Sequence, residues 1–223
     1  MINILHASDN TLLVQFSNKV SKKTSHQLLE LTNYIVKNAV KEITNISPAY
    51  NSLMVRLSEE TSLSDGEKII KTFIKKSQTT LYFNEKLIEI PVCYNNELGP
   101  DLDRVVNHTN YKIPEIIQLH TKKQYFVHFI GFSVGFPYMS GIDKRLETPR
   151  LGSPRSEVRP GSVAIAGKQT GIYPIPTPGG WNIIGRTPLK LFNKKQPVSN
   201  IIKAGSLVKF KPISFKEYEM LRS

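Results

Sequence analysis

The fold is decided by residues 131–189, which read GFSVGFPYMSGIDKRLETPRLGSPRSEVRPGSVAIAGKQTGIYPIPTPGGWNIIGRTPL. This stretch holds ten of the 13 glycines and eight of the 14 prolines of the chain. Short apolar runs lie between these residues and also flank the stretch, at 125–130 and 206–210. Many short strands separated by Gly and Pro turns are typical of a compact β-barrel or sandwich. We therefore predict a β-barrel domain over residues 125–223, ending in a short helix from Phe215 to Leu221.

The N-terminal part has a different pattern. Apolar residues recur every three or four positions in 21–43, and again after a possible capping box at 64–67, which predicts two amphipathic helices. Short apolar runs and alternation predict strands between and beside them, at 11–16, 43–46, 52–57 and 86–92. The order β-α-β-β-α-β matches a ferredoxin-like domain over residues 1–92. Residues 93–124 are expected to form a helical connection to the barrel.

Composition limits the classes of protein to consider. The chain has 223 residues, of which 39% are hydrophobic and 22% charged, values typical of a globular protein. The single cysteine, Cys93, excludes an internal disulfide and a multi-cysteine zinc site. No signal peptide and no run of 18 apolar residues is evident, so we expect a cytoplasmic protein with no membrane partner.

The net charge of +12 is concentrated in the C-terminal part. Residues 1–144 hold 16 Lys and Arg against 14 Asp and Glu, whereas residues 145–223 hold 14 against 4. Such a bias predicts an anionic partner, or else a solvated basic surface. Nucleic acid is the less favoured partner, because neither an RNP signature nor a helix-turn-helix pattern is present.

Standard catalytic motifs are missing from the sequence. Residues 131–135 fit G-x-S-x-G as letters, but Pro137 follows at once and no histidine occurs after His128. The five histidines do not have metal-ligand spacing, so no metal site is expected. His108, His120 and Gln169 are weak catalytic candidates.

Arginines and aromatic residues in the barrel region are the better candidates for binding. Arginines recur every four or five residues in a Pro-rich loop, where they could present guanidinium groups to carboxylates or phosphates, or could instead hold loop carbonyls. The predicted ligand-binding residues are Tyr138, Arg145, Arg150, Arg155, Gln169, Thr170, Trp181, Arg186 and Thr187. Glycines that are expected to shape the loops are Gly135, Gly167, Gly171, Gly179 and Gly180. Phe132 and Ile183 are expected in the barrel core.

These residues also form ordered segments that resemble one known family. The segments are RLETPR (145–150), SPR (153–155), GSV (161–163), QTGIYP (169–174), PGGW (178–181), IGRTP (184–188), PAY (48–50), IPVCY (90–94) and GFPY (135–138). They closely resemble the family of B subunits of bacterial ATP-dependent 5-oxoprolinase, also called PxpB, KipI or allophanate hydrolase subunit 1. The resemblance covers nearly the whole chain. Val134 departs from it, because the family usually has proline there.

The resemblance implies a fold and a function. The fold is α+β: an N-terminal ferredoxin-like domain followed by a C-terminal cyclophilin-like β-barrel. The function is that of a component that is inactive alone and that opens 5-oxo-L-proline to L-glutamate with the C subunit, a KipA-like direct partner, and with the A subunit. ATP is the co-substrate, and the missing Walker A pattern favours a binding site outside this chain. Two alternatives stay open: a KipI-like inhibitor of a histidine kinase, and a component of a urea carboxylase or allophanate-type carboxyltransferase.

Overall fold

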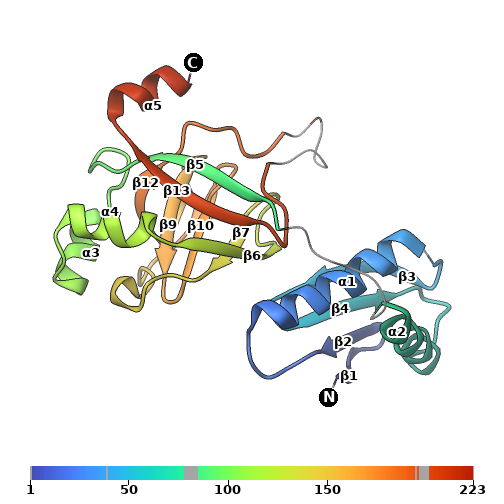
Figure 1. Cartoon of the computed structure of the whole chain (residues 1–223). Coiled ribbons are helices and arrows are strands. Elements are labelled where there is room, and N and C mark those ends of the chain that lie inside the picture. Colours follow the sequence, from blue (N-terminus) through green and yellow to red (C-terminus); the bar gives the residue numbers. More distant parts are fainter. Residues whose placement is uncertain (1, 39, 78–84, 194, 196–200, 223) are drawn as a thin grey trace. The chain divides into compact units, whose positions relative to one another are not determined.

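The structure is a computed structural model, and it describes residues 2–38, 40–77, 85–193, 195 and 201–222. Contacts within the chain divide it into two compact units, Met1–Asn84 and Glu85–Ser223. Figure 1 traces both units along the sequence, from blue to red. Among the described residues, none of the helices has both the length and the apolar character that crossing a membrane requires.

The first unit is a four-stranded antiparallel sheet with two helices. Its elements are β1 (Asn3–Ser8), β2 (Thr11–Gln15), α1 (Lys22–Asn38), β3 (Ile43–Pro48), β4 (Ser52–Leu57) and α2 (Leu63–Ser77). The strand order is β1-β2-β4-β3. Buried side chains of β2 and β4, such as Leu12 and Val55, pack with Leu28 of α1 and Ile70 of α2. The sheet therefore has one face covered by the amphipathic helices that the sequence predicted.

Two local details differ from prediction. The cap of α2 is Ser62, whose hydroxyl accepts a hydrogen bond from the Asp65 backbone N–H at 3.1 Å and donates one to the Asp65 carboxylate at 2.7 Å. The cap of the helix, the Ser62 hydroxyl, thus lies two residues before the predicted box at 64–67. The strand β1 was not predicted at all.

The assignment of residues 86–92 to the first sheet is wrong. This segment is a strand, β5 (Leu87–Cys93), but it runs parallel to β13 (Leu207–Ile213) and also pairs with β12 (Asn182–Arg186). Alternate residues of β5 are buried in the core of the second unit, where Ile90 packs in the same cluster as Phe210. In the first sheet, β1 instead lies beside β2 through a tight hairpin. The contacts consequently divide the chain after residue 84 and not after residue 92.

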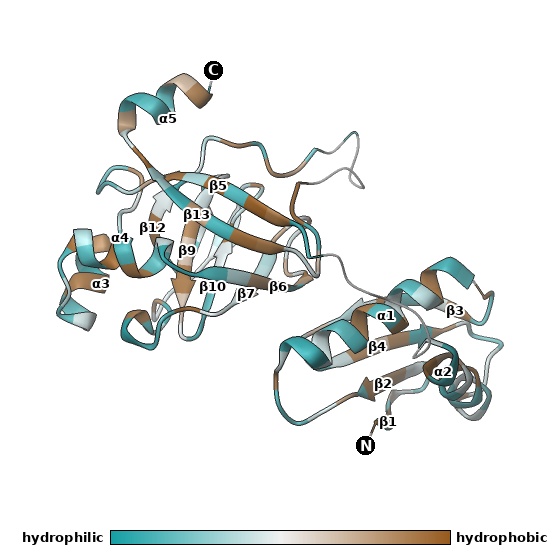
Figure 2. Ribbon diagram, viewed as in Figure 1, coloured by the Kyte–Doolittle hydropathy of each residue, from teal (hydrophilic) through white to brown (hydrophobic). Residues whose placement is uncertain are grey.

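The second unit is built around a closed barrel, which confirms the predicted β-barrel. Its strand order is β10-β7-β6-β13-β5-β12-β9. The strands not yet introduced are β6 (Gln124–Ile130), β7 (Pro137–Ser140), β9 (Ser162–Ala166) and β10 (Gln169–Ile172). In Figure 2 the strands β5, β9 and β13 carry hydrophobic stretches, as expected of strands that line a core.

The predicted helical connection belongs to the barrel unit. It contains α3 (Leu102–Thr109) and α4 (Ile113–Thr121). Leu102 and Ile116 from these helices are fully buried in one cluster with barrel residues such as Ile165 and Val208. Close to the C-terminus, α5 (Phe215–Arg222) confirms the last predicted helix.

A two-stranded sheet lies outside the closed barrel. It pairs β8 (Arg155–Val158) with β11 (Thr177–Gly179) in antiparallel register. We call this pair the β8–β11 ribbon. It contains residues from the Pro-rich arginine loop and from the segment before Trp181, so it brings together two of the stretches in which binding residues were predicted.

Candidate functional site

The candidate site is a pocket of about 370 Å³ in the barrel unit. Residues from the β6–β7 loop, from the arginine loop and from the ribbon form it: Phe132, Phe136, Tyr138, Arg150, Leu151, Gly152, Pro154, Tyr173, Pro178, Gly179, Gly180 and Trp181. We call it the aromatic pocket. It contains the predicted Tyr138, Arg150, Trp181, Gly179 and Gly180.

Aromatic rings meet edge to face around this pocket. The Phe136 ring centroid lies 5.1 Å from that of Tyr138, 5.0 Å from that of Tyr173 and 5.3 Å from that of Trp181. The Tyr138 and Trp181 rings are themselves 5.8 Å apart at 77°. Such edge-to-face packing is the geometry that aromatic quadrupoles favour. The rings therefore form a fixed apolar wall.

Gly179 is required by this packing, and Gly180 is not. A Cβ atom at Gly179 would lie 2.7 Å from ring carbons of Tyr173, whereas one at Gly180 would be 3.7 Å from its nearest neighbours. Gly171 has a similar role, since a Cβ there would come within 2.7 Å of the Phe136 ring. Close approach of backbone to ring thus explains two of the predicted loop-shaping glycines.

The β6–β7 loop presents Phe132 at the rim of the pocket. Phe132 has a φ of 65°, in the left-handed region that non-glycine residues seldom adopt, and its side chain is 64% exposed. Its ring stands edge-on to Phe136 at 5.7 Å. Gly135 at φ 84° completes the turn. The prediction of Phe132 as core is wrong, because the turn directs the side chain outward; Ile183 is buried, as predicted.

Arg150 is held at the pocket by its neighbours and not by its own side chain. The carbonyl of Pro149 accepts a hydrogen bond from Asn182 Nδ2 at 2.9 Å, and the Leu151 N–H donates to the Gly180 carbonyl at 2.7 Å. The guanidinium itself makes no hydrogen bond or ion pair with a described residue. A pre-positioned cation with unused donors is suited to binding a carboxylate or phosphate.

The hydroxyl groups in the pocket are neutral donors. Burial raises the pKa of Tyr138, and burial also raises the pKa of Tyr173, although a hydrogen bond with the Trp181 backbone partly offsets the effect there. None of the described residues that line the pocket is Asp, Glu, His or Lys. The pocket can therefore bind and orient a ligand, but it brings no general base with it.

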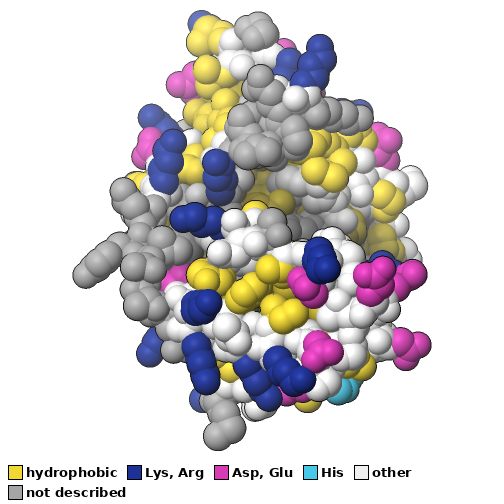
Figure 3. All heavy atoms as spheres, turned by 90° about the vertical axis from the view of Figure 1, so that its right-hand side faces the viewer, with side chains coloured by type: hydrophobic (Ala, Val, Ile, Leu, Met, Phe, Trp, Pro, Cys, Tyr) yellow, Lys and Arg dark blue, Asp and Glu magenta, His cyan; other side chains and the backbone are white. Residues whose placement is uncertain are grey.

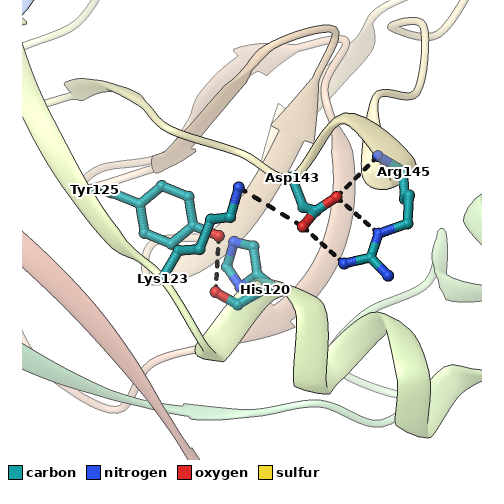
Figure 4. Close-up of polar contacts among 5 residues, drawn as sticks. All are labelled: His120, Lys123, Tyr125, Asp143 and Arg145. Atoms are coloured by element: carbon teal, nitrogen blue, oxygen red, sulfur yellow. Dashed lines mark hydrogen bonds and ion pairs between the residues drawn. The ribbon is translucent and has the colours of Figure 1, made fainter.

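Other predicted arginines lie elsewhere. Arg155 and Arg186 line a second pocket on the ribbon. Arg145 lines neither pocket. Figure 4 shows its contacts: its guanidinium donates to both Asp143 carboxylate oxygens, at 2.9 and 3.0 Å, and Lys123 is 3.6 Å from the same carboxylate. Hydrogen bonds from Arg145 lower the pKa of Asp143. The acceptor for Arg145 is thus a carboxylate, and not a loop carbonyl as in the alternative for the loop arginines.

The prediction of His120 as catalytic is not supported, because its ring is enclosed. Its Nδ1 is 2.8 Å from the Tyr94 hydroxyl and its Nε2 is 3.0 Å from the Thr170 hydroxyl. Burial lowers the pKa of His120 to about 3, so the ring is neutral. The Tyr125 hydroxyl donates to the His120 carbonyl at 2.7 Å (Figure 4).

Thr170 and Thr187 are also structural. Thr170 is fully buried and donates to the Ala164 carbonyl at 3.0 Å, and Thr187 is 2% exposed and accepts from the Leu189 N–H at 3.3 Å. Both oxygens are used inside the fold, so the structure does not support a ligand-binding role for either residue.

The other weak candidates are not gathered at one place. Gln169 opens β10 opposite Ala166 and Ser140. His108 is exposed in the last turn of α3. Gly167, at φ 53°, makes the turn between β9 and β10. Neither Gln169 nor His108 lines the aromatic pocket.

Metal-ligand patterns do not suggest another site in the described parts of the chain. There, no three His, Cys, Asp or Glu side chains are grouped as a metal would need. On the face drawn in Figure 3, Lys and Arg side chains lie at many places, separated by hydrophobic and uncharged side chains. The basic character of this face is thus spread out.

Comparison with known proteins agrees with the fold and the sequence segments. Residues 2–202 match the family described as carboxyltransferase domain, subdomain C and D, so the chain is a member of that class. It is 34% identical over 221 residues to the B subunit of 5-oxoprolinase from Bacillus subtilis (strain 168), which covers 94% of this chain and 92% of the relative. The chain belongs to the family of 5-oxoprolinase B subunits, which confirms the predicted resemblance.

Solved structures show the same fold within larger chains. The crystal structure of TTHA0988 has a TM-score of 0.79 at 27% identity, over 93% of this chain and 40% of that one. Urea carboxylase from Kluyveromyces lactis has a TM-score of 0.78 at 15% identity, over 98% of this chain and 22% of that one, which shows the fold alone. The chain thus spans less than half the length of both.

Proposed function

We propose that this chain is the B subunit of an ATP-dependent 5-oxoprolinase, which opens 5-oxo-L-proline to L-glutamate together with the A and C subunits. Membership of the family supports this role. The observation that carries it is the aromatic pocket lined by the Arg150 guanidinium, which has no partner among the described residues. The substrate is a small five-membered lactam with one carboxylate, so the ring can pack on the aromatic wall while Arg150 binds the carboxylate.

The residues of the pocket indicate that this chain binds the substrate while other subunits supply the remaining catalytic groups. The half-buried Tyr138 phenol can donate a hydrogen bond to the lactam oxygen, where negative charge develops when the ring is activated. The base that activates water would come from the C subunit, as the direct partner, or from the A subunit, and ATP would be bound mainly there or across an interface with this chain. The chain alone is therefore expected to be inactive.

Turnover with and without the other two proteins tests this proposal. Release of ADP that depends on 5-oxoproline is measured for the chain alone and with the A and C subunits. Replacing Arg150→Ala removes a charge-assisted hydrogen bond, which is worth about 1.5–3 kcal/mol, so KM for 5-oxoproline is expected to rise roughly tenfold or more. The matched control is Arg145→Ala, whose guanidinium is paired with Asp143 away from the pocket.

Two results would contradict the proposal. One is turnover by the chain alone. The other is an equal KM in the Arg150→Ala and Arg145→Ala complexes, provided that both variants still assemble with the C subunit. Assembly is followed separately by size-exclusion chromatography, so that loss of the complex is not mistaken for loss of substrate binding.

A carboxyltransferase component is the second candidate, and the family description and the fold shared with urea carboxylase favour it. That role requires a biotinylated carrier supplied by another protein, since the sequence has no Ala-Met-Lys-Met-like biotin site. Carboxyl transfer from such a carrier, in the absence of 5-oxoproline, would favour it over the first candidate. Inhibition of a histidine kinase stays a prediction from the resemblance.

The same proposal names the two units and the compartment. The first unit has the sheet and helices of a ferredoxin-like domain, with β1 at the edge where the last strand of such a unit would lie. The barrel unit would be the cyclophilin-like domain. A buried, free thiol at Cys93 supports the cytoplasm.

A further inference from the structure

The β8–β11 ribbon also borders a second pocket, of about 290 Å³, which differs in chemistry from the aromatic pocket. Its described lining residues are Glu97, Leu98, Pro100, Arg155, Glu157, Val158, Arg159, Ser162, Ile183 and Arg186. Three of these are arginines from two separate segments of the chain. We call it the arginine pocket.

Arg155 is fixed on one side of this pocket. Its Nη2 donates to Asp101 at 2.6 Å, and the other Asp101 oxygen accepts from the Ile183 N–H at 2.7 Å. The Asp101 side chain is 7% exposed and that of Arg155 is 30% exposed. The second terminal nitrogen of Arg155, Nη1, is buried and has no hydrogen-bond partner among the described residues. One donor of this guanidinium is therefore unused where solvent does not reach it.

The turn at 159–161 fixes the other two arginines. Gly161, at φ 83°, donates from its N–H to the Tyr173 carbonyl at 2.7 Å and accepts from the Thr187 N–H at 2.9 Å. Its neighbour Pro160 accepts from Arg186 Nε at 2.8 Å. The backbone beside Arg159 is thus hydrogen-bonded to the residues that directly follow β10 and β12, and the Arg186 side chain is hydrogen-bonded to that backbone.

The positive charge in this pocket is only partly compensated. Arg159 forms no hydrogen bond or ion pair with a described residue, and Arg186 forms no ion pair with one. Burial, together with the nearby Arg222 and Arg159 charges, lowers the pKa of Arg186, an effect that Tyr218 partly offsets. The carboxylates of Glu97 and Glu157 also line the pocket but form no ion pair with its arginines in the described structure. An anion that enters the pocket would therefore meet more positive than negative side chains.

We propose that the arginine pocket binds a phosphoryl group, either as inorganic phosphate or as the terminal phosphate of a nucleotide. Guanidinium forks from two directions match the oxygens of a phosphoryl group. The carboxylates of the two glutamates would repel a ligand that carries many negative charges, so the pocket suits one phosphoryl group and not a long polyanion. The inference rests on the proposed function in one respect only: ATP-dependent ring opening supplies both forms of phosphate.

Phosphate binding to the complete chain, without turnover, tests the inference. Inorganic phosphate and ADP are titrated separately into the protein by isothermal calorimetry at low ionic strength. In Arg159→Ala, the dissociation constant for inorganic phosphate is expected to rise about tenfold or more, because Arg159 is exposed and its loss removes one charged donor without opening the core. In Glu157→Gln it is expected to fall a few-fold, because a like charge is removed.

The matched control is Arg145→Ala, which removes an arginine outside both pockets and is expected to change phosphate binding less than twofold. Melting temperatures confirm that all variants fold. If Arg159→Ala weakens the binding of inorganic phosphate, the ligand of the pocket is the free anion. If the variant weakens the binding of ADP alone, the ligand is the nucleotide. Either result supports the inference. Absence of binding, or equal binding in Arg159→Ala and Arg145→Ala, would overturn it, even if the complex is an active 5-oxoprolinase.

Discussion

The interior of the closed barrel and the β8–β11 ribbon use polar side chains in opposite ways. In the interior, both ring nitrogens of His120 have partners, the hydroxyls of Tyr94 and Thr170, and all three side chains belong to the fold. Along the ribbon and the loop that leads into it, Arg150 and Arg159 have no described partner. A residue type that suggests chemistry is therefore structural where its hydrogen bonds are satisfied, and is a candidate for function where they are not.

The aromatic pocket and the arginine pocket are joined by one hydrophobic cluster. Val158 and Ile183 of this cluster line the arginine pocket, whereas Phe136 and Tyr173 line the aromatic pocket. The ribbon thus contributes to both pockets and rests on the same apolar support. A change in this support is expected to reach both pockets, whereas a change in one arginine should stay local.

The largest expected effect comes from breaking the interior network. In His120→Ala, a cavity opens in the core and the buried Tyr94 hydroxyl loses its partner, so the free energy of unfolding of the barrel unit should fall by about 3–5 kcal/mol. Urea unfolding followed by Trp181 fluorescence measures it, because this single tryptophan lies in the barrel unit. The exposed His108→Ala should change stability by less than about 0.5 kcal/mol. Equal losses of unfolding free energy in His120→Ala and His108→Ala would show that the interior network does not stabilise the barrel unit.

A smaller effect is expected where the ribbon lies against the aromatic wall. Gly179→Ala places a methyl group against the Tyr173 ring and should cost about 1–3 kcal/mol, or displace the ring and weaken ligand binding. Gly180→Ala, one residue further on, has room for its methyl group and should leave both properties nearly unchanged. Thermal unfolding and ligand titration of the pair provide the measurement. A Gly180→Ala variant that is as damaged as Gly179→Ala would show that the ring contact is not the cause.

Much of the fold could be predicted because its signals are local. The periods of α1 and α2 and the Gly and Pro turns of the barrel can be read within short windows of sequence. The partner of β5 could not be predicted, because pairing with β13 joins residues that are more than a hundred positions apart. β1 was missed because most of its residues are exposed at the sheet edge, so no apolar alternation marks it.

The sequence could predict which kinds of residue form the candidate site, but not which of them lie together in one pocket. Tyr138, Arg150 and Trp181 are together as expected, whereas Arg155 and Arg186 are in another pocket. The acceptor of a guanidinium can be near or distant in the sequence. Arg145 pairs with Asp143, two residues away, whereas Arg155 pairs with Asp101, which lies far from it in the sequence. Phe132 could have been found from the Gly131 and Gly135 that bracket it, since glycines so placed in a hairpin loop favour an outward turn.

The smallest expected effect is a pH dependence that belongs to the interior alone. Burial lowers the pKa of His120 to about 3 in the folded chain, against about 6.5 when unfolded. Between these values the unfolded state binds a proton that the folded state does not, so stability is complete above pH 6.5 and falls as the pH drops towards 3. From pH 6 to pH 5 the loss from this group should be about 1 kcal/mol. His120→Gln, which does not titrate, should remove that loss, while Arg159→Ala should keep it. Unfolding free energies measured at both pH values check this, and an unchanged slope in His120→Gln would show that the ring is protonated in the folded barrel.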